Sequence, residues 1–266
     1  MVSRKVKRLF SVFLIICMAT TAVVADSTLA NIVKKGVITV ATDMTGVPMQ
    51  YRDASGKPTG FTVELMELAA KEMGVTIKWE DLAWESLIPS LLTGKVDMIA
   101  ANMSMTLSRM KSVRFSDPYF STGIVVLARK NSSLVKWSDA AAPNVKMGAT
   151  MGSTHADYMQ QNWNKKPALY ENLTEWLTDL KNGRIDGVME DQLIALNLVK
   201  KDPDLKVLIG FVRPDTYGLT FRQDQDSDSL VNWFNWFIRW EKMNGNYGKI
   251  YEKYVGTEYV PDILAQ

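Results

Sequence analysis

The sequence predicts an α/β protein built from two lobes. Short β-rich runs alternate with helical patterns from Val37 onward, the same alternation starts again at Lys146, and a turn-rich junction separates the two halves. Alternating strands and helices are typical of a parallel sheet with helices on both faces, whose ligands bind at the carboxyl ends of the strands. Two such units in one chain predict two sheets that face a common cleft.

The N-terminal segment has the pattern of a secretory signal peptide. Four basic residues precede the apolar run Leu9 to Val24, and Ala25 offers a cleavage site, so we expect residues 1–25 to be removed on export. A membrane anchor is the alternative, but the apolar run is shorter than a usual span and is interrupted by two threonines. Lipidation at Cys17 stays open, although Ile16 stands where a small residue is expected.

The elements of the first half follow from periodicity and stop signals. Val37 to Ala41 is a β-rich run, and Thr62 to Met73 is a helical pattern that ends at Gly74. The other elements expected in this half are a strand over 76–79, a helix over 87–92 that stops at Gly94, and an apolar strand over 96–101 that contains Asp97.

The second half repeats the plan, and its sequence echoes the first. Strands are expected over 146–150 and 187–189, and helices over 153–163 and 174–181. The segments 92–97 and 181–186 share a helix stop, a basic residue, a β-branched residue and an aspartate, and Asn102 and Asp191 then follow at equal spacing. A shared plan would place Asn102 and Asp191 at matching rims of the cleft, whereas the alternative is coincidence in a common helix–turn–strand motif.

Two turn-rich junctions predict a hinge. They lie at 115–123, just before an apolar strand expected over 124–127, and at 213–218. If the chain crosses between the lobes near 117–123 and 213–218, residues 26–120 and 216–266 form a discontinuous first lobe and residues 121–215 form the second. Two crossings of this kind make a hinge.

Composition excludes several functional classes. The chain of 266 residues has a net charge of +2, and its basic cluster is N-terminal, so no nucleic-acid partner is expected. His155 is the only histidine, and no nucleophile-elbow, Walker or dinucleotide motif is present, so we expect no hydrolytic triad, metal or cofactor. Paired carboxylates stay open, because Asp43, Glu190 and Asp191 all follow strands. Nothing indicates an oligomer, and a monomer is expected.

One segment favours a zwitterionic ligand. Residues 102–109 run from a strand end into an expected helix start, with Thr106 as N-cap and Arg109 in the first turn. A carboxylate there would meet backbone N–H groups, hydroxyls and a guanidinium, and Gly152-Ser153-Thr154 opens a second-half helix in the same way. Asp191 could pair with an ammonium group. Taken alone, a capped helix with a solvated arginine is the commoner case, and a capping role for Asp191 is about as common as an ammonium-binding role.

The ordered motifs resemble the family 3 periplasmic solute-binding proteins for polar amino acids, over essentially the whole mature chain. The resemblance implies a type II periplasmic-binding-protein fold, whose two lobes close over a free amino acid and deliver it to an ABC permease in the inner membrane. The matching segments are 41–43, 51–57, 60–65, 84–92, 94–97, 104–109, 115–119, 152–154, 184–191 and 246–251.

The resemblance also implies a role for individual positions. It implies that Arg109, Ser104 and Thr154 hold the ligand carboxylate, and that Asp191 and the backbone near Asn102 hold the ammonium group. One departure is Gly46, where the family often carries an aromatic residue, so stacking from that side is lost. The positions that match the side-chain pocket are Asp43, Trp84, Thr150, His155 and Glu190.

Charge suggests the ligand class. If Asp43 and Glu190 both face the ligand side chain, a cationic amino acid such as lysine, arginine or ornithine would offset their desolvation. Glutamine or histidine is the alternative, because Asp43 can serve structurally and Glu190 can point outward. A more distant alternative is cyclohexadienyl dehydratase, in which the resemblance implies an acid at the position of Ile194. Signal sensing stays a second alternative, although no kinase or cyclase is attached.

Overall fold

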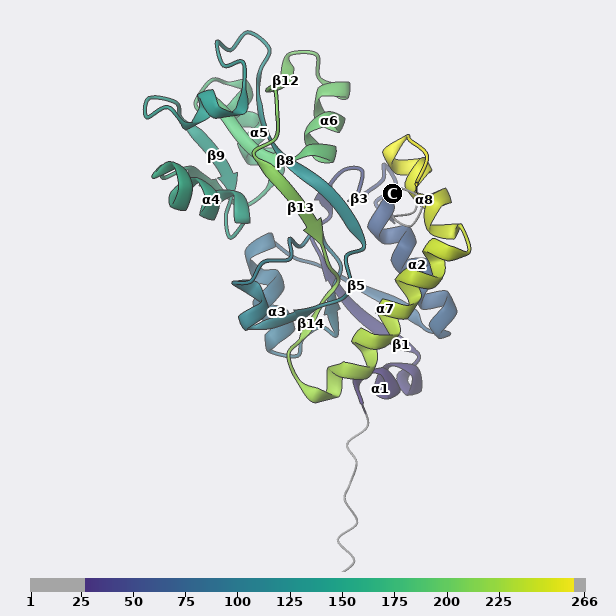
Figure 1. Cartoon of the computed structure of the whole chain (residues 1–266). Helices are drawn as coiled ribbons and strands as arrows, with labels where there is room; N and C mark the ends of the chain where they lie inside the picture. Colours follow the sequence, from purple (N-terminus) through teal and green to yellow (C-terminus); the bar gives the residue numbers. More distant parts are fainter. Residues whose placement is uncertain (1–26, 261–266) are drawn as a thin grey trace, which may run out of the picture.

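The computed structural model describes residues 27–260, which form two α/β lobes, one above the other in Figure 1. The predicted signal peptide, residues 1–25, and Cys17 lie outside the described residues. Within residues 27–260, no helix combines the length and apolarity needed to cross a membrane. The α-helices are α1 (Thr28–Lys35), α2 (Phe61–Met73), α3 (Leu87–Leu92), α4 (Thr154–Trp163), α5 (Leu173–Lys181), α6 (Gln192–Lys201), α7 (Asp228–Met243) and α8 (Asn246–Val255), and the 3₁₀ turns are η1 (Trp84–Ser86), η2 (Arg109–Lys111), η3 (Trp137–Ala141) and η4 (Gln225–Ser227).

The first lobe contains a mixed sheet in the order β5-β1-β6-β14-β7. Its β1 pairs in parallel with β5 and β6, as expected, but β14 is antiparallel to β6 and β7. The expectation of a purely parallel sheet is therefore wrong here, because β14 is reached from the other lobe. The strands are β1 (Val37–Thr42), β5 (Thr76–Asp81), β6 (Met98–Ile99), β7 (Val113–Phe115) and β14 (Thr220–Arg222), and a small separate sheet holds β2 (Thr45–Gly46), β3 (Gln50–Arg52) and β4 (Pro58–Thr59).

The second lobe contains a mixed sheet in the order β10-β9-β11-β8-β12, with β13 also paired to β8. Its β9 is parallel to β10 and β11, whereas β8 is antiparallel to β11, β12 and β13. Only the strands that are linked through helices are parallel. The strands expected over 146–150, 187–189 and 124–127 correspond to β9, β11 and part of β8, whereas β10 and β12 were not predicted. The strands are β8 (Phe120–Arg129), β9 (Met147–Thr150), β10 (Ala168–Tyr170), β11 (Gly187–Asp191), β12 (Leu205–Val207) and β13 (Arg213–Tyr217).

The strands β8 and β13 carry the chain between the lobes (Figure 1). They pair with each other from Phe120 opposite Tyr217 to Ile124 opposite Arg213. Phe120 and Tyr217 belong to the core of the first lobe, whereas Ile124 belongs to a core of the second. One strand pair is thus anchored in both lobes, at the positions where the sequence places the crossings. The exact lobe boundaries stay a prediction.

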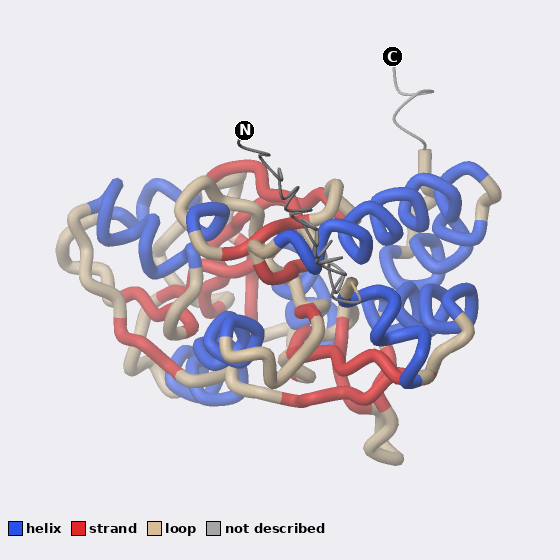
Figure 2. The backbone as a smooth tube through the Cα atoms, turned by 90° about the horizontal axis from the view of Figure 1, so that it is seen from below, coloured by secondary structure: helices blue, strands red, loops and turns tan. Residues whose placement is uncertain are grey.

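Each lobe buries apolar side chains on both faces of its sheet. Along β8, Ile124 and Val126 contribute to one core, and Val125 and Leu127 contribute to another. This alternation follows from the strand geometry, since successive side chains point to opposite faces. Helices flank the strands, as the blue and red segments show in Figure 2, which views the stacked lobes from below. The sheets are therefore rigid platforms, and the loops at their ends carry the cleft.

The internal echo in the sequence corresponds to a repeated local structure. Gly94 and Gly183 both adopt the left-handed conformation, with φ of 72° and 75°, at the end of a helix. In each lobe the chain then enters a buried strand, β6 or β11. The expected strand over 96–101 is reduced to Met98–Ile99, so Asn102 follows β6 after a short extended segment.

Candidate functional site

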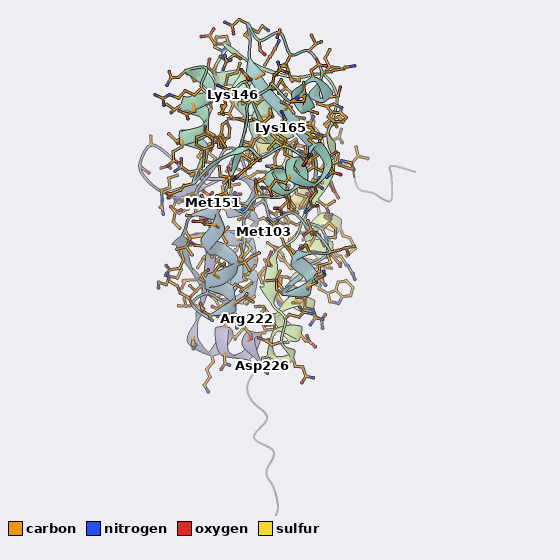
Figure 3. The ribbon with its side chains drawn as sticks, turned by 90° about the vertical axis from the view of Figure 1, so that its left-hand side faces the viewer. Met103, Lys146, Met151, Lys165, Arg222 and Asp226 are labelled. Atoms are coloured by element: carbon orange, nitrogen blue, oxygen red, sulfur yellow. The ribbon has the colours of Figure 1, made fainter. Side chains whose placement is uncertain are left out.

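A cavity lies between the lobes, with about 560 Å³ of space between its atoms, its mouth included. Both lobes contribute to its wall. In Figure 3, Met103 of the first lobe and Met151 of the second lie where the two lobes meet. The residues that line the cavity are Asp43, Thr45, Gly46, Gln50, Trp84, Asn102 and Ser104 from the first lobe, and Thr150, Ser153, Thr154, His155, Leu173, Glu190, Asp191 and Ile194 from the second.

The strand ends place most of this wall. Asp43 follows β1, Asn102 follows β6, and Thr150 and Asp191 end β9 and β11. All four strands take part in parallel pairs, so their carboxyl ends meet at one edge of each sheet, and that edge faces the cleft. Asn102 and Asp191, which the equal spacing placed at matching rims, thus line the same cavity. Of the ten residues that the sequence suggested, nine line it.

The tenth, Arg109, lies beside the cavity and spans the two lobes. Its Nη1 donates to the carbonyl oxygen of Ser104 at 3.1 Å, and its Nη2 donates to the carbonyl oxygen of Gly152 at 3.3 Å. The guanidinium carbon lies 5.7 Å from the centre of the Trp84 ring. Burial lowers the pKa of Arg109, and nearby carboxylates, Asp157 first among them, oppose that shift. The expected α-helix start is wrong: Thr106 accepts from the Arg109 N–H, but only the 3₁₀ turn η2 follows.

Gly152 receives donors from the opposite lobe. Trp84 Nε1 donates to its carbonyl oxygen at 3.2 Å, beside the bond from Arg109. Gly152 has a φ of 72°, a left-handed conformation that glycine adopts at little cost. A side chain there would be strained, and its Cβ would lie 3.5 Å from Glu85 Cβ across the cleft. Gly152 therefore provides both the turn before α4 and a contact point for the first lobe.

The inner wall holds three buried titratable side chains in close contact. His155 Nε2 lies 3.4 Å from Asp191 Oδ1, and Glu190 accepts from the Asp191 backbone N–H at 2.8 Å. Burial raises the pKa of Glu190 to about 7, while His155 opposes this shift and Asp191 adds to it. For His155, burial lowers the pKa, but the Asp191 and Glu190 carboxyl groups outweigh it and hold the pKa above its usual value.

Asp191 is not used as a helix cap. It occupies the N-cap position of α6, yet its side chain makes no capping hydrogen bond. Its Oδ1 is buried and has no hydrogen-bond partner among the described residues, and the same holds for His155 Nε2. A buried acceptor of this kind costs free energy unless a ligand satisfies it. The capping alternative for Asp191 is thus wrong, and its side chain lines the cavity beside His155 instead.

The same three side chains have a spacing that could hold a metal ion. One ligand atom from each of His155, Glu190 and Asp191 lies within 4.8 Å of the others, and all three residues are buried. The sequence did not predict this cluster, because a single histidine does not suggest a metal site and the burial of two carboxyl groups beside it depends on the fold. The expectation of no metal stays a prediction.

Sequence reasoning missed part of the first-lobe wall. Gln50 on β3 and Thr45 on β2 line the cavity, and so does Leu173 of the second lobe. Gln50 occupies the space beside Gly46, since a Cβ on Gly46 would lie 3.0 Å from Gln50 Nε2 and 3.5 Å from Ile194 Cδ1. The absence of an aromatic side chain at Gly46 was the one sequence feature that could have indicated Gln50, because another side chain had to fill the space that the aromatic ring leaves.

A family model, described as bacterial extracellular solute-binding proteins, family 3, matches residues 38–257. The chain belongs to this family. Its members are solute-binding proteins found outside the cytoplasm, and the resemblance noted from the motifs is confirmed.

Named relatives of this solute-binding protein bind different amino acids. It is 31% identical to a probable histidine-binding protein of Neisseria gonorrhoeae, over 82% of this chain and 83% of the relative. It is 29% identical to the L-cystine-binding protein TcyJ of Escherichia coli, over 88% of each chain. It is 31% identical to the ABC transporter arginine-binding protein 1 of Escherichia coli, over 78% of this chain and 86% of the relative.

Solved structures confirm the two-lobed α/β fold. A mutant of ArgBP from T. maritima superposes with a TM-score of 0.81 at 31% identity, covering 86% of this chain and 100% of that chain. An ancestral amino acid-binding protein, described as a precursor of cyclohexadienyl dehydratase, superposes with a TM-score of 0.80 at 33% identity, covering 86% and 99%. Ile194, the position that the resemblance marks for a dehydratase acid, lines the cavity of this solute-binding protein as an apolar side chain.

Proposed function

We propose that this protein binds a free amino acid with a cationic side chain, such as arginine, lysine or ornithine, and delivers it to an ABC importer. The charge of the cavity wall carries the proposal. Among the described residues that line the cavity, Asp43, Glu190 and Asp191 are carboxylic acids, and none is lysine or arginine. A ligand with a net positive charge offsets the desolvation of these groups, whereas an acidic ligand is repelled.

Unsatisfied acceptors support the same ligand class. Gln50 Oε1, Asn102 Oδ1 and Asp191 Oδ1 are buried and have no hydrogen-bond partner within the described part of the chain. An α-ammonium group offers three N–H donors and a guanidinium offers five, so a cationic amino acid can reach all of these acceptors. Glutamate offers donors only at its ammonium end, and its side-chain carboxylate would face acceptors.

The α-carboxylate would lie near Arg109 and the start of α4. Arg109 uses two N–H groups in the bonds to Ser104 and Gly152, which leaves three donors for a ligand. The helix α4 has ten residues, and its first backbone N–H groups belong to Thr154 and His155. The N-terminus of such a helix is a favourable place for an anion. Asp191, whose carboxylate lies 3.4 Å from His155 Nε2, would accept from the α-ammonium group.

The side-chain end would then lie among the remaining wall residues. Trp84 offers one aromatic wall for an apolar stem, Thr150 and His155 line the same cavity, and Asp43 and Glu190 offer the charge. Burial raises the pKa of Asp43, and hydrogen bonds from Thr45 oppose this shift. A cationic ligand group beside Asp43 would stabilise its ionised form. The relative named for arginine binding supports this assignment, the relative named for histidine binding supports the alternative, and the cystine-binding relative supports only amino-acid binding.

Titration calorimetry tests the proposal directly. The mature protein, freed of bound ligand by unfolding and refolding, is titrated with arginine, lysine, ornithine, histidine, glutamine, cystine, glutamate and prephenate. We expect binding of the cationic amino acids and none of glutamate. Glu190→Gln should narrow the preference for cationic over neutral ligands, whereas Glu72→Gln, on the exposed face of α2, should leave it unchanged.

Other outcomes of the same titration have clear meanings. Tight binding of glutamine or histidine with no cationic ligand bound would establish the neutral alternative. Binding of prephenate alone would revive the dehydratase alternative, which Ile194 disfavours. Tight binding of glutamate would show that the charge argument is wrong.

Export and delivery belong to the proposal as well. The family description supports a location outside the cytoplasm. Cleavage after Ala25 would release a mature chain that begins at Asp26, into the periplasm of a cell with two membranes, where an inner-membrane permease can receive the ligand. N-terminal sequencing of the exported protein checks the cleavage site, and an uncleaved or lipidated N-terminus would contradict it.

A further inference from the structure

Four polar side chains beside the cavity form a closed hydrogen-bonded ring. Ser104 Oγ donates to Asp215 Oδ2 at 2.7 Å and lies 3.3 Å from Thr154 Oγ1. Arg213 Nη2 donates to Thr154 Oγ1 at 3.2 Å, and Arg213 Nη1 lies 3.5 Å from Asp215 Oδ1. Asp215 and Ser104 are 6% and 4% exposed, so water does not compete freely for these bonds.

The chemistry of the two ends fixes the direction of every bond in the ring. An arginine can only donate, and an ionised aspartate can only accept. Ser104 has one hydroxyl proton and gives it to Asp215, so its bond with Thr154 requires Thr154 as the donor. The order is therefore Arg213 to Thr154, Thr154 to Ser104, and Ser104 to Asp215. In this arrangement neither hydroxyl has a proton left for a ligand carboxylate.

The ring joins the two lobes at the crossing strand. Ser104 belongs to the first lobe, where it forms a β-bridge with Tyr217, and Thr154 begins α4 in the second. Arg213 and Asp215 lie on β13, which pairs with β8 at the crossing. The Ser104–Thr154 contact can exist only when the lobes are together. Arg213 donates to Thr154 and Asp215 accepts from Ser104, both from the crossing strand β13. Neither Arg213 nor Asp215 lines the cavity.

We propose that Arg213 and Asp215 are positioning residues for lobe closure. They orient the hydroxyl groups of Thr154 and Ser104 so that these side chains bind each other across the cleft. The ligand carboxylate is then left to Arg109 and the backbone N–H groups of α4, instead of the two hydroxyls that the resemblance suggests. This inference rests on the proposed binding of an amino acid between the lobes, and it predicts that the ring affects all ligands alike.

A double-mutant cycle tests the ring. Arg213→Gln and Ser104→Ala are compared singly and together, by calorimetry, with arginine and with a second ligand that the wild-type protein binds. Since a hydrogen bond to a charged group contributes about 1.5–3 kcal/mol, each single variant should weaken binding roughly tenfold to a hundredfold. The factor should be the same for both ligands. The double variant should be little worse than either single one, because the first substitution already opens the ring.

Controls separate the ring from general destabilisation. Arg213→Lys keeps the positive charge that Arg213→Gln removes and should restore part of the affinity, while Arg184→Gln, which removes a surface ion pair with Asp179, should change nothing. Thermal unfolding of each variant shows whether it is folded. Fully additive losses in the double variant, a change of ligand preference or unchanged affinity in Arg213→Gln would each overturn the proposal.

A distance measurement keeps the test independent of ligand identity. Spin labels are attached through Lys71→Cys on α2 and Lys166→Cys in the second lobe, both exposed. Without added ligand, Arg213→Gln should reduce the population of short interlobe distances relative to the wild-type protein. An unchanged distance distribution contradicts the ring as a closing device. Failure of the wild-type protein to bind any amino acid would instead contradict the proposed function alone.

Discussion

Asp97 and Asp186 make the same two hydrogen bonds at equivalent places in the two lobes. Asp97 Oδ2 accepts from the Thr39 N–H at 2.8 Å, and the Asp97 N–H donates to the Thr39 carbonyl at 2.9 Å. Asp186 Oδ2 accepts from the Lys146 N–H at 2.8 Å, and the Asp186 N–H donates to the Lys146 carbonyl at 2.7 Å. Each aspartate thus fastens the turn after a helix to the neighbouring strand, and it sets where Asn102 and Asp191 enter the cleft.

Removing either aspartate should destabilise its lobe. Asp97→Ala should lower the free energy of unfolding by about 1–3 kcal/mol, because a half-buried backbone N–H loses its charged acceptor. Asp186→Ala should cost less, because water can reach the exposed Lys146 N–H. Asp→Asn at the same positions keeps an acceptor oxygen and should cost less. Urea unfolding followed by circular dichroism measures both, and an alanine variant as stable as the asparagine one would contradict this role.

Arg109→Ala should weaken binding of every α-amino acid by at least about a hundredfold. The substitution removes the proposed partner of the carboxylate, which all these ligands share, together with the bond from Arg109 to Gly152 across the cleft. Calorimetry with two chemically different ligands measures the loss. Arg184→Ala, at the surface, serves as the matched control, and an Arg109→Ala protein of normal affinity would remove Arg109 from the site.

Glu190 should make stability depend on pH. Burial raises the pKa of Glu190 from 4.5 to about 7; the charge of His155 opposes this shift, and those of Asp191 and Asp43 add to it. Between pH 4.5 and pH 7, the unfolded chain has therefore lost a proton that the folded protein keeps. The contribution of Glu190 to stability therefore falls as the pH rises through this window. Glu190→Gln should raise the melting temperature at pH 8 more than at pH 5. Equal shifts at both pH values, or the same shift in Glu72→Gln, would show that burial of the Glu190 carboxyl group is not the cause.

Removal of metal ions should not affect amino-acid binding. His155, Glu190 and Asp191 have a spacing that could hold a metal, but in the proposed site the ligand ammonium group satisfies Asp191. Dialysis against EDTA should leave the dissociation constant unchanged, and added Zn²⁺ should compete with the amino acid. Loss of binding after EDTA treatment, restored by Zn²⁺ in the wild-type protein but not in His155→Ala, would show a metal-dependent site.

Much of the fold and the cavity wall could be predicted because both depend on local patterns. Strand–helix alternation located β1, β5, β6, β9 and β11, and strand ends located Asp43, Asn102 and Asp191, since carboxyl ends of parallel strands share an edge. The antiparallel direction of β8 and the strand β14 were not predicted. Their direction depends on the chain crossing between lobes, which periodicity within one segment does not encode.

Long-range contacts account for what the sequence did not predict in the site. Gln50 lines the cavity because a small side chain at Gly46 leaves it room, and that is a relation between two strands. Arg213 and Asp215 matter through Ser104 and Thr154, which are distant in sequence. The Arg109 segment looked like a helix start because its capping threonine is present, yet only one 3₁₀ turn forms.

The pairing of β8 with β13 determines how the lobes can move. Two separate single-chain linkers would let one lobe slide, twist and tilt against the other. In this protein the two crossings are hydrogen-bonded to each other and are anchored at Phe120 and Tyr217 in one core and at Ile124 in another. Such a ribbon flexes across its thin dimension and resists in-plane shear. Opening therefore approximates rotation about a single axis, and one well-chosen distance across the cleft describes the whole motion.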